Sequence, residues 1–384
     1  MNVEEFFETL KRDAVSIYNE DSLLEKLKSG KKLKIKLGAD PSRPDLHLGH
    51  SVVLRKLRAF QDLGHEIIFV IGDFTGMIGD PSGKSKARVP LSFEQTRENG
   101  QTYLEQVTKI LDKDKTSIEY NSSWLSKMNF ADVLALAGKY TLARIMERDD
   151  FAKRFGNNQA IGIHELLYPL MQGYDSVALN ADVEVGGTDQ TFNLLVGREL
   201  QKDYCQAQQE VITFPLLPGL DGKEKMSKSL DNYIGLSEAA EIMFEKCMKV
   251  PDSVLPDYYR LTCELKTIPE DIREAHFAYA REIVRMYHGA TAVAAAENRY
   301  REIAGGGLPG EIQAVTIERT PICIVDLLIE LGFSSSKGEA RRLIQGKGIK
   351  INGEAVSDAA MLLGNTPELI LSRGKNKFLK VIFS

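Results

Sequence analysis

The sequence contains no uninterrupted apolar run that approaches the roughly 20 residues needed to cross a lipid bilayer. Its amino end, MNVEEFFETLKRD, is acidic and amphipathic, which is unlike a secretory signal. We therefore expect a cytoplasmic protein with no membrane association. Cysteine is also scarce, and no CxxC pair is present to grip a metal or to exchange electrons. The cysteines, which we expect to be free thiols, are Cys205, Cys247, Cys263 and Cys323.

An excess of basic residues is missing too, since the formal net charge is −5. This balance argues against a protein that is coated in nucleic acid. The average conceals a split, because residues 320–384 carry nine Lys or Arg and six Asp or Glu, a net charge of +3 that leaves −8 for the rest. An acidic body with a basic end is typical of an enzyme that holds a polyanion at one edge.

Length and patterning indicate several domains and an α/β fold. A chain of 384 residues exceeds one ordinary core. The segments 33–37 and 66–71 have strand patterns, and an apolar helical repeat lies between them, capped by Asp45 after Pro44 and ended by Gly64. Further strand-like runs occur at 117–120, 176–185 and 211–217, separated by helical segments. The pattern predicts a doubly wound, Rossmann-like parallel sheet.

The rest of the chain divides at composition changes. We predict a catalytic domain at 1–236 with an insertion at about 125–175, a helical domain at 237–304 and a glycine-rich linker at 305–319. A small α+β domain at 320–384 contains helices at 322–331 and 337–345, the second opened by a capping box of Ser336 and Glu339. Its strands turn at Asn352-Gly353 and at Gly374.

The segment DPSRPDLHLGH joins the first predicted strand to the first helix, where free backbone N–H groups and the helix dipole attract anions. His47 and His50 are placed there to donate to phosphate oxygens, and Gly49 allows a ligand close to the backbone. A zinc site is the alternative, because HxxH spacing suits zinc. No other Cys or His is spaced as an obvious third ligand, so phosphate binding ranks first.

A glycine-rich turn, GMIGDPSGKS at 76–85, resembles a P-loop, but its first glycine stands out of register. We therefore exclude a P-loop kinase. The turn follows a strand, where open α/β sheets bind ligands. Asp80 is available there for a cation, and Lys84 and Arg88 for phosphate. A flexible surface loop is an equally weighted alternative.

Three polar residues, Tyr168, Gln172 and Asp175, are spaced to share one face of a helix. A polar stripe is usually solvated, but these neighbours are mostly apolar, which favours a buried polar pocket. Such a pocket suits a small zwitterion with a hydroxyl group. Pro169 must then sit in the first turn or kink the helix.

Two more polar loops follow predicted strands. GGTDQ at 186–190 offers an N-cap in Thr188 or Asp189, and a carboxylate at such a place also holds ribose. KEKMSKS at 223–229 is a lysine cluster that alone would indicate an ordinary solvated surface. Together with the histidine pair, it supplies cations for a departing polyphosphate.

HLGH and KMSKS, in this order, make the chain resemble the class I aminoacyl-tRNA synthetases. The runs IGDPSGK and GGTDQ and the stripe of Tyr168, Gln172 and Asp175 extend the resemblance, over nearly the full length, to the bacterial tyrosyl-tRNA synthetases. Its C-terminal domain is similar to their RNA-binding module of ribosomal-protein type. The helical domain would then lie on the anticodon side.

The resemblance implies roles for individual residues. His47, His50, Lys225 and Lys228 would be catalytic, contacting the ATP phosphates. Other ATP-binding residues would be Asp40, Gly49, Lys84, Arg88, Gly187, Asp189, Met226, Ser227 and Ser229. Tyrosine-binding residues would be Lys36, Asp80, Asn121, Tyr168, Gln172, Asp175 and Gln190, with Trp124 completing an NxxW element. Residues binding tRNA would be Lys337, Arg341, Arg342 and Lys347.

One position departs from the better-known branch of that family. Lys36 stands where that branch has a tyrosine beside the substrate phenol, and the sequence KLG resembles a second branch. A lysine there could pair with Asp175 in the empty site and hold it ionised.

The resemblance also implies a reaction and its partners. The tyrosine carboxylate would attack the α-phosphorus of ATP, with Mg²⁺ accompanying the nucleotide, and tyrosine would then pass to tRNA(Tyr). The protein itself would hold no metal of its own, and a homodimer would form through the insertion. The alternatives are a tryptophanyl synthetase, a simpler nucleotidyltransferase with an HxGH motif, and a non-catalytic RNA-binding protein built on a synthetase body.

Overall fold

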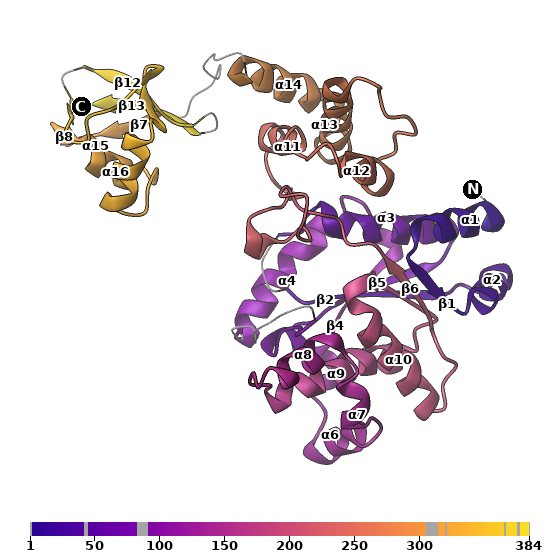
Figure 1. The fold of residues 1–384 in the computed structure, drawn as a ribbon. Helices are drawn as coiled ribbons and strands as arrows, with labels where there is room; N and C mark the ends of the chain where they lie inside the picture. Colours follow the sequence, from indigo (N-terminus) through magenta and orange to yellow (C-terminus); the bar gives the residue numbers. More distant parts are fainter. Residues whose placement is uncertain are drawn as a thin grey trace. The chain divides into compact units, whose positions relative to one another are not determined.

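The chain forms two compact units, Met1–Gly289 and Ala290–Ser384, in the computed structural model (Figure 1). The structure describes residues 2–41, 45–82, 91–304, 314–318, 321–364, 366–374 and 377–383, and of Ser229 only the backbone. Lys84 and Arg88 therefore lie outside the described residues. The two units do not test the finer division into catalytic domain, helical domain, linker and C-terminal domain, which stays a prediction.

A six-stranded sheet organises the first unit, in the order β1-β6-β5-β2-β3-β4. Strands β2 to β6 run parallel and confirm the doubly wound fold, whereas β1 is an antiparallel edge strand that the sequence pattern did not reveal. The strands are β1 (Ser16–Tyr18), β2 (Lys34–Ala39), β3 (Glu66–Ile71), β4 (Thr116–Tyr120), β5 (Val183–Gly187) and β6 (Glu210–Phe214). The chain order reverses beside β2, which creates a crevice at the carboxyl ends of β2 and β5.

Helices cover both faces of this sheet, with α1 and α3 on one side and α9 and α10 on the other (Figure 1). Three more, α11 to α13, form the helical end of this unit, which was predicted as helical. The helices are α1 (Val3–Asp13), α2 (Glu20–Lys28), α3 (Leu48–Asp62), α4 (Phe93–Val107), α5 (Ser122–Leu125), α6 (Phe130–Ala137), α7 (Leu142–Ile145), α8 (Asp149–Gly156), α9 (Ile163–Leu179), α10 (Thr191–Asp203), α11 (Ala240–Cys247), α12 (Leu255–Thr262) and α13 (Ile272–His288).

Two local predictions in this unit are wrong. The N-cap of α3 is His47 and not Asp45, so the first histidine closes the loop and the second lies in the first helical turn. The predicted strand at 176–185 is half helix, because α9 continues to Leu179 and ends on Asn180 in the left-handed conformation (φ 50°). The short apolar run Val177–Leu179 at its start fits a helix as well as a strand, and asparagine adopts the left-handed conformation more readily than most residues.

Helix α9 is held tightly against α10. A Cβ at Gly173 would lie 2.9 Å from Leu200 Cδ1 and 3.1 Å from the Gly197 backbone nitrogen, so only glycine fits this crossing. Pro169 lies beyond the first turn of α9, and the helix runs through it. The close crossing fixes the turn that carries Gln172 and Asp175 relative to the helix that begins after Gln190.

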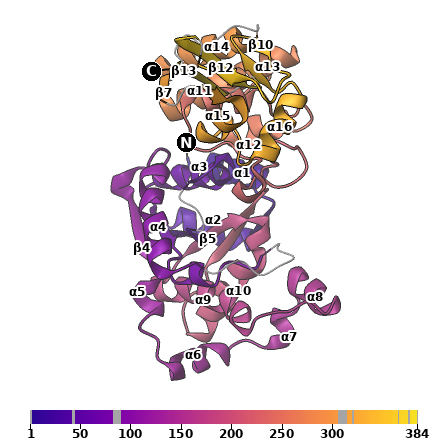
Figure 2. The same ribbon diagram turned by 90° about the vertical axis from the view of Figure 1, so that its left-hand side faces the viewer.

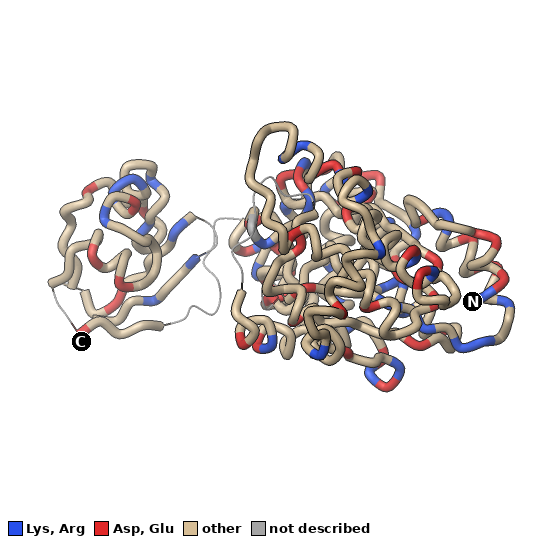
Figure 3. Tube along the Cα trace, turned by 90° about the horizontal axis from the view of Figure 1, so that it is seen from below, with Lys and Arg blue, Asp and Glu red and all other residues tan. Residues whose placement is uncertain are grey.

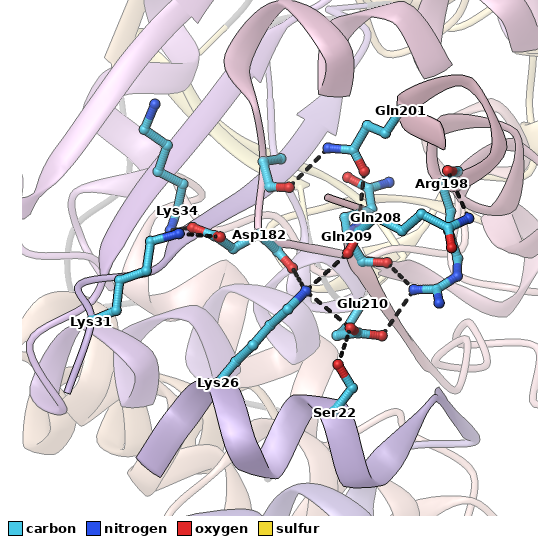
Figure 4. Close-up of polar contacts among 11 residues, drawn as sticks. Ser22, Lys26, Lys31, Lys34, Asp182, Arg198, Gln201, Gln208, Gln209 and Glu210 are labelled. Carbon is cyan, nitrogen blue, oxygen red and sulfur yellow. Dashed lines mark hydrogen bonds and ion pairs between the residues drawn. The ribbon is translucent and has the colours of Figure 1, made fainter. Parts of the chain in front are cut away.

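The amino ends of β5 and β6 are tied to α2 by a cluster of polar side chains (Figure 4). The buried Glu210 carboxylate accepts hydrogen bonds from Ser22 (2.7 Å) and Arg198 (2.9 Å) and pairs with Lys26 (2.9 Å). Lys26 also donates to the Gln208 carbonyl (2.9 Å). These contacts lie at the amino ends of the strands, opposite the crevice at the carboxyl ends, and they hold the strand ends in place.

The second unit packs two helices against a five-stranded sheet ordered β10-β9-β12-β13-β7, beside the pair β11-β8. Its own core includes Leu327, Phe333, Ile344 and Val381. The predicted turns are confirmed, since Asn352, Gly353 and Gly374 all have positive φ. Its elements are α14 (Ala290–Ala304), β7 (Ala314–Ile317), β8 (Ile322–Cys323), α15 (Ile324–Glu330), α16 (Lys337–Gln345), β9 (Ile349–Ile351), β10 (Glu354–Ala355), β11 (Leu362–Leu363), β12 (Glu368–Arg373) and β13 (Lys377–Phe383).

The predicted capping box of α16 forms only in part. Ser336 Oγ accepts from the Glu339 N–H, but the Glu339 carboxylate bonds Ser335 instead of returning to the N-cap. None of the described helices has the length and apolar character that a membrane crossing requires.

Candidate active site

A cavity of about 720 Å³ opens at the carboxyl ends of the parallel strands, beside the reversal point of the sheet. It joins residues from the loops after β2, β3, β4, β5 and β6 with the buried side of α9. The predicted residues that line it are Asp40, His47, Gly49, His50, Asp80, Asn121, Tyr168, Gln172, Asp175, Gly187, Asp189, Gln190, Lys225, Met226, Ser227 and Lys228. Segments far apart in the sequence therefore build one site.

The two histidine rings lie against each other at the start of α3, with centroids 3.9 Å apart and planes tilted by 44°. The His47 backbone N–H donates to His50 Nδ1 (3.1 Å), so a neutral His50 carries its proton on Nε2. Burial, and then the nearby Lys228, lowers the pKa of His50 to about 3, and burial likewise holds the pKa of His47 well below its usual value. Both rings are neutral at physiological pH, and each offers one N–H to a ligand.

Gly49 lies between them for a reason that differs from the expected one. A Cβ at this position would approach the His47 ring to 3.0 Å. The glycine therefore leaves space for the His47 imidazole in the first place, and a close ligand approach is secondary.

Asp40, directly after β2, is the centre of a hydrogen-bonded group. Thr75 Oγ1 donates to its Oδ1 (2.7 Å) and the Tyr168 hydroxyl donates to its Oδ2 (2.9 Å). Gln172, one turn further along α9, has a buried side-chain carbonyl oxygen with no hydrogen-bond partner among the residues that the structure describes. This oxygen and the polarised Tyr168 hydroxyl can both accept from an ammonium group in the cavity.

Asp175 is a buried acid that lines the cavity, with 3% of its surface exposed. Trp124 Nε1 donates to its Oδ1 (2.8 Å) and Asn121 Nδ2 donates to its Oδ2 (3.3 Å). Burial raises the pKa of Asp175 to about 7, against the lowering effect of Lys36 and of these two donors. A carboxyl group with such partners is an effective acceptor for a hydroxyl group on an otherwise apolar ligand.

A chain of amides fixes Asp80. Gln190 Nε2 donates to Asp80 Oδ2 (2.8 Å), and Asn193 Nδ2 donates to Gln190 Oε1 (3.1 Å). Arg148, between α7 and α8, donates to Asn193 Oδ1 (3.3 Å) while pairing with Asp150. The short helices of the insertion thus reach the cavity wall through one arginine.

The lysine loop closes the cavity from the far side. Lys225 Nζ pairs with Asp189 (2.6 Å), a contact that the sequence did not predict. Met226 is buried and its N–H bonds the Leu217 carbonyl (2.8 Å), while the Ser227 N–H bonds Asn232 Oδ1 (2.8 Å). The backbone of this loop is therefore anchored, and Lys225 and Lys228 both face the cavity.

Lys36 does not reach the cavity as expected. It is fully buried, and its ammonium group pairs with Glu184 (2.9 Å) and donates to Ser176 Oγ (2.8 Å) and the Gln172 carbonyl (3.0 Å). The expected ion pair between Lys36 and Asp175 is wrong, because Glu184 is the residue in register with Lys36 on the neighbouring strand.

Among the described residues, no group of three or more His, Cys, Asp or Glu side chains is placed to hold a metal ion. The zinc interpretation of His47 and His50 thus finds no third ligand in this part of the chain. Lys84 and Arg88 are outside it, and the Ser229 side chain is not described.

The predicted basic residues of the second unit lie on or next to α16. Lys337 pairs with Asp326 (2.8 Å), and with Arg341 it lines a hollow of about 290 Å³. Arg341, Arg342 and Lys347 are exposed.

Figure 3 shows that acidic and basic positions are interspersed along the trace of the first unit.

Sequence reasoning missed Asn193, Arg148 and Glu184. Asn193 follows Gln190 at helical spacing, which was a usable signal. Glu184 was also detectable, since an acid in a predicted buried strand needs a cation, and Lys36 stands in another such strand. Arg148 gave no signal of its own.

Comparison with known proteins identifies the family. Residues 28–304 match the model for class I tRNA synthetases of the W and Y type, and residues 306–381 match the SYY-like C-terminal domain of tyrosine–tRNA ligase. A tyrosine–tRNA ligase of Deinococcus radiodurans is 50% identical over 399 residues, covering 99% of this chain and 97% of the relative. One of Geobacter sulfurreducens is 50% identical over 403 residues, covering 100% of both.

Solved structures agree on the fold. A C-terminally truncated mitochondrial tyrosyl-tRNA synthetase of Aspergillus nidulans aligns with a TM-score of 0.63 at 22% identity, covering 78% of this chain and 94% of that one. A tyrosyl-tRNA synthetase of Archaeoglobus fulgidus complexed with L-tyrosine aligns with a TM-score of 0.61 at 23% identity, covering 78% and 99%. The chain belongs to the class I tRNA synthetases, in the family of the tryptophan and tyrosine enzymes.

Proposed function

We infer that the chain is a tyrosine–tRNA ligase, which forms tyrosyl-adenylate and pyrophosphate from L-tyrosine and ATP and then transfers tyrosine to the terminal adenosine of tRNA(Tyr). The observation that carries this function is that one cavity contains both the histidine pair with the lysine loop and the buried Asp175. The first set suits a polyphosphate, and the second suits a phenol. The bacterial relatives named tyrosine–tRNA ligase support the same reading at about half identity over the full chain.

The geometry supports an orientation for tyrosine. Its phenol points to Asp175, and its ammonium group lies among Tyr168, Gln172 and Asp80. The unpartnered Gln172 oxygen gains a donor when the ammonium arrives, which removes the penalty of a buried acceptor without a partner. The carboxylate then faces the side of Gln190, toward the nucleotide.

ATP occupies the part of the cavity between the histidines and the lysine loop. Neutral His47 and His50 donate hydrogen bonds to phosphate oxygens, while Lys225 and Lys228 supply the positive charge for the departing pyrophosphate. Asp189 is placed for the ribose, and its pairing with Lys225 in the empty site must yield when the nucleotide enters. No side chain acts as a nucleophile, so the protein contributes alignment and charge.

Magnesium enters as part of the nucleotide substrate. Mg²⁺ is commonly held by substrate phosphates, waters and one or two carboxylates. The acids that line the cavity include Asp40, Asp80 and Asp189, each already held by hydrogen bonds or an ion pair to neighbouring residues.

The direct test is tyrosine-dependent exchange of pyrophosphate into ATP by the full chain. We expect exchange with tyrosine and little with tryptophan, because an indole has no hydroxyl for Asp175. Exchange without any amino acid would indicate a simpler nucleotidyltransferase. Absence of exchange, together with RNA binding, would indicate a non-catalytic RNA-binding protein.

We expect Lys228→Ala to slow adenylate formation by about 10²- to 10³-fold, with little change in tyrosine affinity. The contact strengthens as pyrophosphate charge develops, which corresponds to about 2.7–4 kcal/mol for one preorganised charged partner. Lys225→Ala should have a similar effect, although it also releases Asp189. Lys223→Ala, an exposed lysine of the same loop, is the control. Single-turnover rates that match wild type in both site variants would remove the lysines from the mechanism.

We also propose a homodimer that forms through the insertion. This segment, α6 to α8 and the start of α9, carries several large apolar side chains that are exposed in the single chain, and exposed apolar surface of this kind marks an interface. The residues are Phe130 (77% exposed), Leu134 (57%), Leu142 (60%), Phe155 (70%) and Ile163 (79%). Figures 1 and 2 both place α6 and α7 on the side of the first unit away from α3.

The double variant Phe130→Asp/Ile163→Asp should sediment as a monomer at micromolar concentration, where wild type sediments as a dimer. Two carboxylates in an apolar interface lose solvation without gaining partners. Val15→Asp, at an exposed apolar residue outside the insertion (59%), should leave the mass unchanged. A wild-type monomer would contradict the dimer, whereas a dimer that persists in the double variant would place the interface elsewhere.

Because its substrates meet in the cytoplasm, we expect the protein there.

A further inference from the structure

We propose that Lys36 and Glu184 form a positioning pair that sets the orientation and charge of Asp175, and thereby the recognition of the tyrosine hydroxyl. This inference rests on the proposed function and deepens it. Lys36 was expected to act on Asp175 by pairing with it directly, and Glu184 was not expected in the site. The pair acts on the substrate only through α9 and through the field at Asp175.

The contacts of Lys36 carry the mechanical part of the proposal. Its ammonium group bonds the carbonyl of Gln172 (3.0 Å) and the hydroxyl of Ser176 (2.8 Å), which are four residues apart on α9. These two positions bracket the helical turn that carries Asp175. A single buried cation from the central strand therefore fastens this turn to the sheet.

Glu184 completes the attachment from the next strand. Its Cα is the sheet partner of Lys36, and its carboxylate pairs with the ammonium group (2.9 Å). Ser176 Oγ (2.9 Å) and Gln209 Nε2 (2.6 Å) donate to its other oxygen. Glu184 also lines the cavity floor. The pair therefore lies between the sheet and the tyrosine pocket, completely shielded from solvent.

The charges around Asp175 carry the electrostatic part. Lys36 on β2 lowers its pKa and Glu184 on β5 raises it, while the loop after β4 contributes only the uncharged donors Asn121 and Trp124. Asp40, after β2, connects to Asn121 only through the hydroxyl of Thr75. The net effect of the pair is to oppose the burial that pushes Asp175 toward its protonated form.

If the pair of Lys36 and Glu184 had only a structural role, any break in its hydrogen-bond network would lower stability, whether or not a charge was removed. The charge role predicts shifts of opposite sign in the titration of Asp175. Removing the charge of Glu184 should lower the pKa of Asp175. Removing the charge of Lys36 as well should raise the pKa of Asp175 again. The variants Glu184→Gln and Lys36→Met/Glu184→Gln test this. Neither leaves an unpaired carboxylate at 184, and in Glu184→Gln the amide oxygen can still accept a hydrogen bond from the Lys36 ammonium group.

The glutamine should fit, since the side-chain oxygen of Gln209 is buried and has no partner in the described part of the chain. The Gln209 amide can therefore turn over and accept from the new amide. Ser176→Ala is the matched control, because it breaks the same network without changing any charge.

Trp124 gives a readout that is independent of activity. It is the single tryptophan of the chain, and its indole N–H donates to Asp175 (2.8 Å). Its fluorescence in the empty protein should titrate with Asp175 near pH 7, and Asp175→Asn should abolish that transition. We expect the midpoint to fall by about one pH unit in Glu184→Gln, to rise by at least about one unit from there in the double variant, and to stay in Ser176→Ala.

The acid limb of kcat/KM for tyrosine should follow the same order, because it reports groups of the free enzyme, and the limb for phenylalanine should not. Equal midpoints in Glu184→Gln and the double variant would overturn the proposal. A fall of the midpoint in Ser176→Ala as large as the fall in Glu184→Gln would also overturn it. If the fluorescence midpoints move as expected but no tyrosine-dependent exchange occurs in wild type, the proposed function fails and the pair's effect on Asp175 remains established.

Discussion

Asp175→Ala should remove most of the preference for tyrosine over phenylalanine while leaving the use of ATP nearly intact. Wild type should discriminate by about 10⁵, a size that we take from tyrosine-specific enzymes of this class in general and not from the geometry. The physical reason is that phenylalanine would leave a buried carboxyl group and its two donors without the hydroxyl that completes them. Pyrophosphate exchange with both amino acids, in wild type and variant, measures the ratio.

A suitable control is Glu165→Gln, which alters another buried acid of α9. Glu165 pairs with Arg154 (2.6 Å) and is not among the residues that line the cavity. It should lower stability and leave the selectivity ratio unchanged. If the ratio were unaltered in Asp175→Ala, the phenol would be read by another residue.

Deleting residues 310–384 should leave tyrosyl-adenylate formation intact and reduce the charging of tRNA by about 100-fold or more. The second unit has its own core and carries the exposed cations on and next to α16, while the residues that line the large cavity all belong to the first unit. Phosphate contacts dominate the affinity of proteins for nucleic acids, so the loss should appear in tRNA binding. Exchange and charging assays on the same preparation separate the two steps.

Point variants refine this test in the full-length chain. Arg341→Gln and Arg342→Gln should each weaken tRNA binding and reduce the slope of its logarithmic salt dependence by about one unit per lost phosphate contact. Lys266→Gln, at an exposed lysine in the first unit, is the control. A truncated protein that charges tRNA normally would show that the second unit is not the tRNA clamp.

Much of the fold followed from local pattern. Strand β3 was predicted to the residue, and the reversal of chain order was implicit in alternating strands and helices. The predicted strand at 176–185 failed because four residues of mixed polarity satisfy both periods, and only the left-handed Asn180 decides where α9 ends. The edge strand β1 was missed because three residues give too short a pattern.

The site was predictable where sequence spacing alone brings side chains together. It was less predictable where the role of a residue depends on a partner from another element. The stripe of Tyr168, Gln172 and Asp175 lies in one cavity, as helical spacing indicated. The predicted partner of Lys36 was wrong. Sheet register brings Glu184 beside Lys36, and the register cannot be deduced from the sequence of either strand alone. Arg148 could not be found, because its contact to Asn193 depends on how the insertion folds back.

The buried pair of Lys36 and Glu184 also limits how this sequence can drift over generations. Losing one partner alone strands a charge in a fully enclosed place, at a cost of about 3–5 kcal/mol. That is a large part of the roughly 5–15 kcal/mol by which a typical domain is stable. Glutamine at position 184 alone would still leave the Lys36 ammonium group without a counter-charge, so a lineage that changes either residue singly passes through such a stranded charge. We therefore expect the two positions to be inherited as a unit, so that lysine at one accompanies an acid at the other.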